Sequence, residues 1–202
     1  DSGELVTNGS IQESIAFYGR MFGDYTRESI ESRRDRQGNG ALVFRGVSFQ
    51  TSELHGSSTA MSGQSLRVVA EYQAEETGPL TNVSVSIPFY DQLDQQVFMC
   101  WTSLTGQDFG HIPPCGSFVV DIPLFPLRSG RYYINLHCTV NGVLADWVKR
   151  AAVLDVIEGD FFGTGRTPVA GHGLVYVEHS FRLESPEGVS VETESRGSYA
   201  GR

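Results

Sequence analysis

The sequence predicts an all-β protein, an antiparallel β-sandwich of the immunoglobulin-like or jelly-roll kind with a short N-terminal helix. From residue 41 onward, apolar and polar side chains alternate with a period of two, as they do in half-buried strands. The 23 glycines and 8 prolines are spread along the 202 residues and indicate many turns. About eight strands without an intervening helical pattern are typical of a sandwich, and the 40% hydrophobic content is enough for one main core.

The N-terminal helix is predicted to begin at Ser10. The sequence Ser10-Ile-Gln-Glu13 is a capping box, in which each end residue can satisfy a backbone amide of the other. An apolar stripe follows at helical spacing, formed by Ile11, Ile15, Tyr18 and Phe22. Gly23 is placed to end the helix, and the charged residues 23–37 fit a solvated helix extension or a linker.

The strands follow along the rest of the chain. One is expected to bury Leu66, Val68, Ala70 and Tyr72, and the next Val83, Val85, Ile87 and Phe89. Further strands are predicted at residues 42–49, 97–103, 117–124, 131–139 and 147–156. Turn sequences at residues 94–96, 129–130 and 141–142 separate them. Pro123 and Pro126 should lie near a strand end or edge, because proline removes a ladder donor.

A glycine-rich arm follows the last of these strands. Gly163 and Gly165 leave its backbone free, whereas Phe161 and Phe162 need an apolar surface, so the arm is expected to dock. Residues 174–179 then read as one more short strand, carried to a distant edge of the same sheet or to a second copy of the protein. Residues 183–202 are expected to be poorly ordered, with an edge strand at 189–192 as the alternative.

Charge and composition exclude several functions. A net charge of -9, with no basic cluster longer than residues 33–36, argues against binding to nucleic acid or to an anionic membrane surface. No export signal is recognisable, and no apolar run approaches the roughly 18 residues that span a bilayer. Cys100, Cys115 and Cys138 are odd in number, widely spaced and set in apolar strand-like sequence, which predicts reduced, buried thiols in a reducing compartment.

Motifs of catalysis are absent as well. The sequence has no phosphate loop, no nucleophile elbow and no dinucleotide fingerprint, and its five histidines lack the spacing of metal ligands. We therefore predict no enzyme activity, no catalytic residue, no metal and no cofactor.

One strand face nevertheless suits a sugar. Tyr133 and His137 flank Asn135 on the side opposite Tyr132 and Leu136; such a triplet is most often a solvated strand face. It is also what a sugar needs, because rings cover the C–H patches of a pyranose and polar groups pair with its hydroxyls. The candidate carbohydrate-binding residues are Arg67, Glu71, Gln73, Ser86, Tyr90, Tyr133, Asn135, His137 and Trp147. Whether they converge depends on strand order, and Trp147 fits core packing equally well.

Four motifs together resemble a known family. They are Arg36-Gln-Gly-Asn-Gly40, the segment 123–132, Ala145-Asp-Trp147 and the arm sequence Glu158-Gly-Asp-Phe-Phe-Gly-Thr-Gly165. They resemble the C-terminal domain of Wzt-type ATP-binding subunits, which belong to ABC transporters that export O-antigen polysaccharide. The likeness covers residues 36–182, so these would form the carbohydrate-binding sandwich. Residues 1–35 would be a helix and linker from a preceding ATPase domain, and residues 183–202 a flexible C-terminal tail.

The resemblance implies a function. It is non-catalytic recognition of the modified non-reducing terminus of an O-polysaccharide at the cytoplasmic face of the bacterial inner membrane, where binding licenses export. It also implies homodimers that form by exchange of the C-terminal strand, and contact with the transmembrane subunit through the parent chain. The family's ligand residues vary with the glycan, so none is carried over. The alternative is a structural dimerisation domain without glycan selectivity. Arg67 or His137 would suit an anionic cap and a ring pocket a methyl cap, and the sequence does not choose between them.

Overall fold

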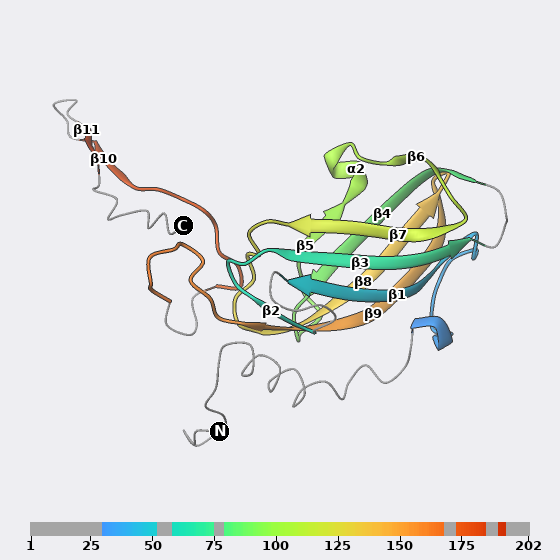
Figure 1. The fold of residues 1–202 in the computed structure, drawn as a ribbon, viewed down its shortest axis with the longest axis horizontal. Helices are drawn as coiled ribbons and strands as arrows, with labels where there is room; N and C mark the ends of the chain where they lie inside the picture. Colours follow the sequence, from blue (N-terminus) through green and yellow to red (C-terminus); the bar gives the residue numbers. More distant parts are fainter. Residues whose placement is uncertain (1–29, 52–57, 75–78, 168–172, 185–189, 193–202) are drawn as a thin grey trace, which may run out of the picture.

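The computed structural model describes residues 30–51, 58–74, 79–167, 173–184 and 190–192, which form a two-layered β-sandwich. The smaller sheet has the antiparallel order β1-β3-β7, with β1 at Leu42–Thr51, β3 at Leu66–Ala74 and β7 at Cys115–Ile122. The larger sheet has the order β2-β9-β8-β4-β5. Figure 1 shows the smaller sheet lying across the strands of the larger one. The predicted all-β, antiparallel sandwich is confirmed.

The larger sheet contains the three longest strands of the described chain, β9, β8 and β4. Its strands are β2 at Thr59–Met61, β9 at Val143–Ile157, β8 at Gly130–Val140, β4 at Leu80–Tyr90 and β5 at Gln96–Trp101. A short β6 at Phe109–Ile112 also pairs with β4. Only the short β2 runs parallel to its neighbour in this sheet, and the remaining pairs are antiparallel. Outside the two sheets lie a 3-10 turn η2 at Ile30–Ser32, a helical turn α2 at Thr102–Thr105, and a hairpin of β10 at Arg182–Glu184 with β11 at Ser190–Glu192.

The core lies between the two sheets and contains the side chains that alternation predicts. The expected apolar sides of β3 and β4 are buried, as are Tyr132, Ile134 and Leu136 of β8. Rings fill both halves of this core: Tyr72 stacks on Phe118 at 4.4 Å between centroids, and Phe89 stacks on Phe98 at 4.3 Å. The first pair joins β3 to β7 and the second joins β4 to β5, so each stack links neighbouring strands of one sheet and adds apolar area to the shared core.

Most predicted boundaries are met within a few residues, and the differences have local causes. The strand predicted at 97–103 ends at Trp101, because the hydroxyls of Thr102 and Ser103 donate to Asp108 and the chain turns into α2. Strands β2 and β6 were not predicted, since three or four residues are too few to show alternation. The helix predicted at 10–22 lies outside the described residues. Part of the alternative edge strand predicted at 189–192 is present as β11. The prediction of three buried thiols is wrong for Cys115, which is exposed at the start of the edge strand β7, whereas Cys138 is buried and Cys100 is intermediate.

Residues 33–40, here called the strap, run along β9. Gln37 and Trp147 exchange backbone hydrogen bonds of 3.1 and 2.7 Å. Gly38 has φ +134°, and a Cβ there would lie 2.2 Å from the carbonyl oxygen of Ala145, so only glycine fits. Arg36 pairs at 3.2 Å with the buried Asp146, which also accepts a hydrogen bond from the Phe44 amide. Two of the sequence motifs therefore meet, and their shared role is structural.

The arm that follows β9 docks at one end of the sandwich. Phe161 is buried and stacks on Tyr176 at 4.8 Å, whereas Phe162 stays partly exposed. The Tyr176 amide donates to the Pro126 carbonyl, and the Arg128 amide donates to the Leu174 carbonyl. Residues 174–179 thus lie against residues 126–128, but they form one isolated bridge instead of the predicted strand. Exchange of this segment with a second copy stays a prediction.

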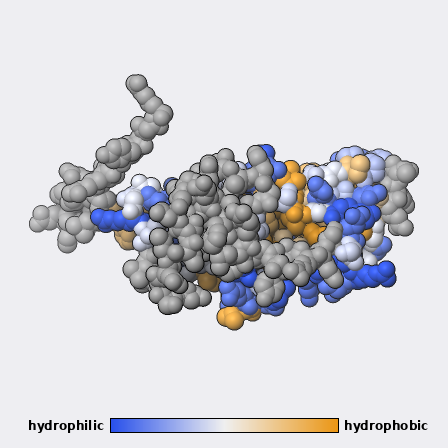
Figure 2. Space-filling view, turned by 60° about the horizontal axis from the view of Figure 1, so that its bottom comes forward, coloured by the Kyte–Doolittle hydropathy of each residue, from blue (hydrophilic) through white to orange (hydrophobic). Residues whose placement is uncertain are grey.

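The surface of the described chain is mixed. On the side displayed in Figure 2, hydrophobic residues form patches between hydrophilic regions. Within the described ranges, no helix has the length and apolar character that would let it cross a membrane.

Candidate functional site

The structure divides the nine predicted site residues between two opposite faces. Arg67, Glu71 and Gln73 lie on β3 and point outward from the three-stranded sheet. Ser86 and Tyr90 of β4, Tyr133, Asn135 and His137 of β8, and Trp147 of β9 belong to the other sheet. A sandwich has two outer faces, so the nine residues do not converge on one of them. The sequence could not show this, since alternation tells which side a residue faces but not which sheet its strand joins. Their role in binding a carbohydrate stays a prediction.

The face of the smaller sheet offers little for a ligand. Arg67 forms an ion pair with Asp121 on the neighbouring strand, with its Nε 2.6 Å from a carboxylate oxygen, and both side chains are largely exposed. This carboxylate neutralises the cation that was expected to suit an anionic cap.

The outer face of the larger sheet, here called the candidate face, brings the other six residues together. Ser86, His137 and Trp147 are direct cross-strand neighbours, and Trp101 of β5 extends this row beyond Ser86. The His137 and Trp147 rings meet edge to face at 6.2 Å, and the Lys149 ammonium lies 4.6 Å from the Trp147 ring centre. Trp147 is thus on the surface of the sheet and not in the core. The row supplies two indole rings with polar side chains between them.

A second row crosses the same face. Tyr90 is paired with Tyr133, and the Arg150 guanidinium lies over the Tyr133 ring at 4.4 Å while it also pairs with Asp94 at 2.8 Å. The β9 strand bulges here, with Arg150 at φ +47°, and the Asn135 side-chain oxygen accepts from the Arg150 amide at 2.7 Å. Asn135 is 6% exposed, so its oxygen serves the bulge.

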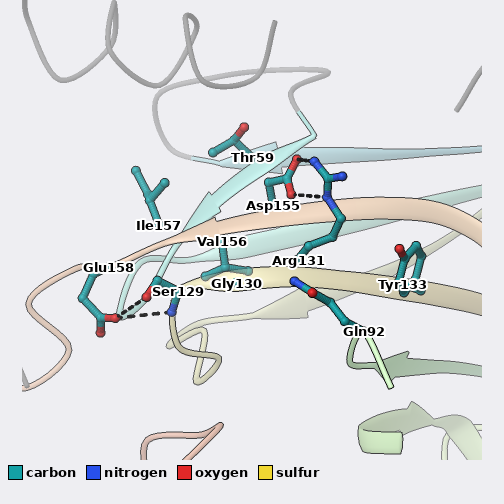
Figure 3. A pocket seen from close by; sticks show the side chains of 10 residues that line it. All are labelled: Thr59, Gln92, Ser129, Gly130, Arg131, Tyr133, Asp155, Val156, Ile157 and Glu158. Carbon is teal, nitrogen blue, oxygen red and sulfur yellow. Dashed lines mark hydrogen bonds and ion pairs between the residues drawn. The ribbon is translucent and has the colours of Figure 1, made fainter. Parts of the chain in front are cut away.

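Next to Tyr133 the face deepens into a pocket of about 730 Å³, here called the end pocket. Its lining residues are Thr59, Gln92, Ser129, Gly130, Arg131, Tyr133, Asp155, Val156, Ile157 and Glu158. Arg131 donates two hydrogen bonds to Asp155, of 2.8 and 3.1 Å, and these side chains are only 19% and 18% exposed. Figure 3 shows this pair between Tyr133 at one end and the Ser129–Glu158 contact at the other.

Of the predicted residues, only Tyr133 lines the end pocket. Arg131 could have been found, because it precedes Tyr133 by two residues and shares its strand face. Asp155 could not, since it is placed opposite Arg131 by the register of β8 with β9. Gln92 comes from the turn between β4 and β5, and no periodic signal marks it.

Electrostatics keep the candidate face near neutrality. Desolvation by burial lowers the pKa of His137 below its usual value, so the imidazole is neutral at neutral pH. Burial alone would raise the pKa of Glu158, but hydrogen bonds from Tyr176 and Ser129, with Arg128 nearby, hold it lower. In the part of the chain that the structure describes, no three His, Cys, Asp or Glu side chains gather as metal ligands would.

A second cavity, also of about 730 Å³, opens between the edge strands β5 and β7. Ile87, Cys100, Leu104 and Phe118 are among the residues that line it. Trp101 and Phe109 also line it, and Asp121 is the one charged residue in its lining. Unlike the end pocket, its lining does not contain both partners of an ion pair.

Comparisons with known proteins agree with this architecture. The family model described as the Wzt C-terminal domain matches residues 33–176. A solved structure titled "Crystal structure of the C-terminal domain of wzt" is similar, with a TM-score of 0.60 and 13% sequence identity. The similarity covers 77% of this chain and 92% of that chain, and at this identity it shows the shared fold. A search of curated proteins found no match.

Proposed function

Because the chain belongs to the Wzt C-terminal domain family, we propose that it is a non-catalytic carbohydrate-binding domain of an O-antigen ABC transporter. In this proposal it recognises the modified non-reducing terminus of the polysaccharide, and binding licenses export at the cytoplasmic face of the inner membrane. The polysaccharide terminus is the ligand, and the transmembrane subunit is reached through the parent chain.

The observation that carries this proposal is the end pocket at the edge of a sheet face rich in rings and polar groups. The face offers Trp101, Trp147 and Tyr133 to the C–H patches of sugar rings. Around them lie hydroxyl, amide, imidazole and ion-paired groups, which can exchange hydrogen bonds with sugar hydroxyls. A cleft that combines apolar surface with a few convergent polar groups is the usual form of a small-ligand site.

The shape of the end pocket favours a chain terminus. Ser129 donates to Glu158 through its hydroxyl at 2.8 Å and its amide at 3.3 Å, and this contact bounds the pocket at the end away from Tyr133. In this proposal a polysaccharide lies along the face from Trp147 toward Tyr133, and its terminal sugar occupies the pocket between Tyr133 and the Ser129–Glu158 contact.

The C-terminal segment supports the proposed homodimer. Leu174, Val175 and Val177 leave apolar side chains exposed, whereas Tyr176 between them is buried. Val175 and Val177 are exposed at the two-residue spacing of a strand on either side of Tyr176, which would suit pairing with a second copy, although Leu174 departs from the alternation. Dimerisation through this strand would place two glycan sites in one assembly, and the resulting avidity would offset the modest affinity of a mostly polar site.

The test is calorimetric titration with the O-polysaccharide of the strain that encodes this chain, before and after chemical removal of its terminal modification. We expect binding of the modified polysaccharide only. Tyr133→Ala should weaken it by about tenfold or more through loss of a stacking ring, with little change in melting temperature. Glu71→Ala is the matched control, since Glu71 is exposed on the opposite outer face.

Each other result assigns a different role. Equal binding of both polysaccharides would indicate recognition within the chain. Loss of binding in Glu71→Ala but not in Tyr133→Ala would move the site to the smaller sheet. No binding to either polysaccharide would refute the proposal and favour a dimerisation domain without glycan selectivity.

A further inference from the structure

The charges around the end pocket indicate the chemistry of the terminus that it accepts. We infer that the end pocket admits an uncharged sugar terminus with an apolar substituent, such as an O-methyl or deoxy group, and rejects a phosphate cap. This inference rests on the proposed function, because it names the ligand class of the same site.

The cationic side chain that lines the end pocket already forms an ion pair with a carboxylate. The lining contains one cationic side chain, Arg131, and two carboxylates, Asp155 and Glu158. Arg131 directs its Nε and one terminal nitrogen at the two oxygens of Asp155, which is the fork geometry that a phosphate would require. A phosphate would have to displace Asp155, or else lie beside two carboxylates of its own sign.

Two arginines close to the pocket are also paired with carboxylates. Arg128 lies 3.5 Å from Glu158. Arg150 pairs with Asp94 and covers the Tyr133 ring, but it does not line the pocket. The charge of this guanidinium is therefore paired outside the lining of the pocket. Lys149 is placed over Trp147, one row away along β9.

Arg67 and His137, which were predicted to suit an anionic cap, do not supply a cation to the end pocket. Arg67 lies on the opposite outer face and is paired with Asp121. His137 is on the candidate face, but burial lowers the pKa of its imidazole and so disfavours the cation. Neither residue brings positive charge to the end pocket.

The rest of the lining suits an uncharged end. The Gln92 amide and the Arg131–Asp155 pair offer donors and acceptors to hydroxyls, while the Tyr133 ring and Ile157 offer apolar surface. A methyl group against such a surface changes affinity by roughly 10- to 200-fold, which is enough to distinguish a finished from an unfinished terminus.

Salt dependence provides the first test. The unmodified chain is titrated with the O-polysaccharide of its own strain at low and at high salt. We expect dissociation constants within about twofold of each other, because contacts without net charge are hardly screened. A loss of about tenfold or more at high salt would show recognition of an anionic end and overturn the inference, while the proposed function would stand. No binding at either salt concentration would refute both.

The second test removes the negative charge that is paired with Arg131. Asp155→Asn keeps the shape of the pair but removes its negative charge, so inorganic phosphate should shift the NMR signals of Tyr133 and Arg131 in this variant and not in the unmodified chain. Asp121→Asn is the matched control: it makes the same change beside Arg67 on the opposite face and should leave those signals unmoved. Phosphate shifts at Tyr133 in the unmodified chain, or none in a folded Asp155→Asn variant, would overturn the charge argument.

Discussion

At the scale of single residues, His137 shows how burial sets the chemistry of the candidate face. Its ring lies between Ser86 and Trp147 in the cross-strand row and is half-buried. Burial disfavours the imidazolium and lowers the pKa of His137 from its ordinary value of 6.5. A neutral imidazole has one donor and one acceptor, so it can pair with a hydroxyl in either direction.

The same burial predicts a pH dependence of stability. Between the lowered pKa and 6.5 the unfolded chain binds more protons at this residue than the folded chain does. Stability conferred by neutral His137 is therefore complete above pH 6.5 and is lost as pH falls through the folded-state pKa. From about pH 7.5 to about pH 5.5, the unmodified chain should lose more unfolding free energy than His137→Gln in urea titrations. An NMR titration that gives His137 a pKa of 6.5 or higher would contradict this prediction.

At the scale of elements, the strap is the feature that ties the sequence before β1 to the candidate face. Its backbone bonds to β9 run from Leu144 to Trp147, and Arg33 adds side-chain hydrogen bonds to the carbonyls of Lys149 and Arg150. The β9 residues that it holds include those placed beside Tyr133 and over Trp147. The strap therefore supports the strand that carries Trp147 and, further along, the pocket residue Asp155.

Two glycines of the strap give a matched pair of substitutions. Gly38→Ala would place a Cβ against the backbone of Ala145 and keep a left-handed φ, so we expect a loss of about 2–4 kcal/mol in unfolding free energy. Gly40→Ala also has a positive φ of 78° but meets no atom within 4 Å, and should cost only about 1 kcal/mol. Chemical denaturation measures both. Equal losses would show that the close approach at Gly38 contributes nothing.

The strands also show how much of the fold and of the candidate site the sequence predicts. Alternation predicts the inward side of β3, β4 and β8, because the apolar residues of each strand mark the side of that strand that is buried. It does not predict that β3 and β4, consecutive in sequence, belong to different sheets. Arg67 and Ser86 were both predicted to face outward, but the two sheets put them on opposite sides of the sandwich, and Ser86 is only 8% exposed. The pairing of Arg131 with Asp155 depends on the long-range register of β8 and β9 and was beyond reach for the same reason.

At the scale of the whole molecule, the segment before β1 and the segment after the arm differ in how extensively they pair with the sandwich. The strap is closed onto β9 by backbone pairing, whereas the segment after the arm makes one bridge, at Val175, and leaves apolar side chains in solvent. In Figure 1 the β10–β11 hairpin, which follows this segment, extends away from the sandwich. Exposed apolar residues at strand spacing favour pairing with another chain. The proposed exchange would bury them.

Val177 tests that assembly. Its side chain is 66% exposed, so Val177→Asp should hardly change the stability of a single chain. In an exchanged dimer the same side chain would be desolvated, and the substitution should weaken dimerisation by about tenfold or more, measured by sedimentation velocity across a concentration series. Leu93→Asp is the matched control, because Leu93 is 78% exposed on the turn between β4 and β5 and belongs to no proposed interface. A dimer that Val177→Asp and Leu93→Asp leave equally intact would place the interface elsewhere, and an unmodified chain that sediments as a monomer at every concentration would refute the homodimer.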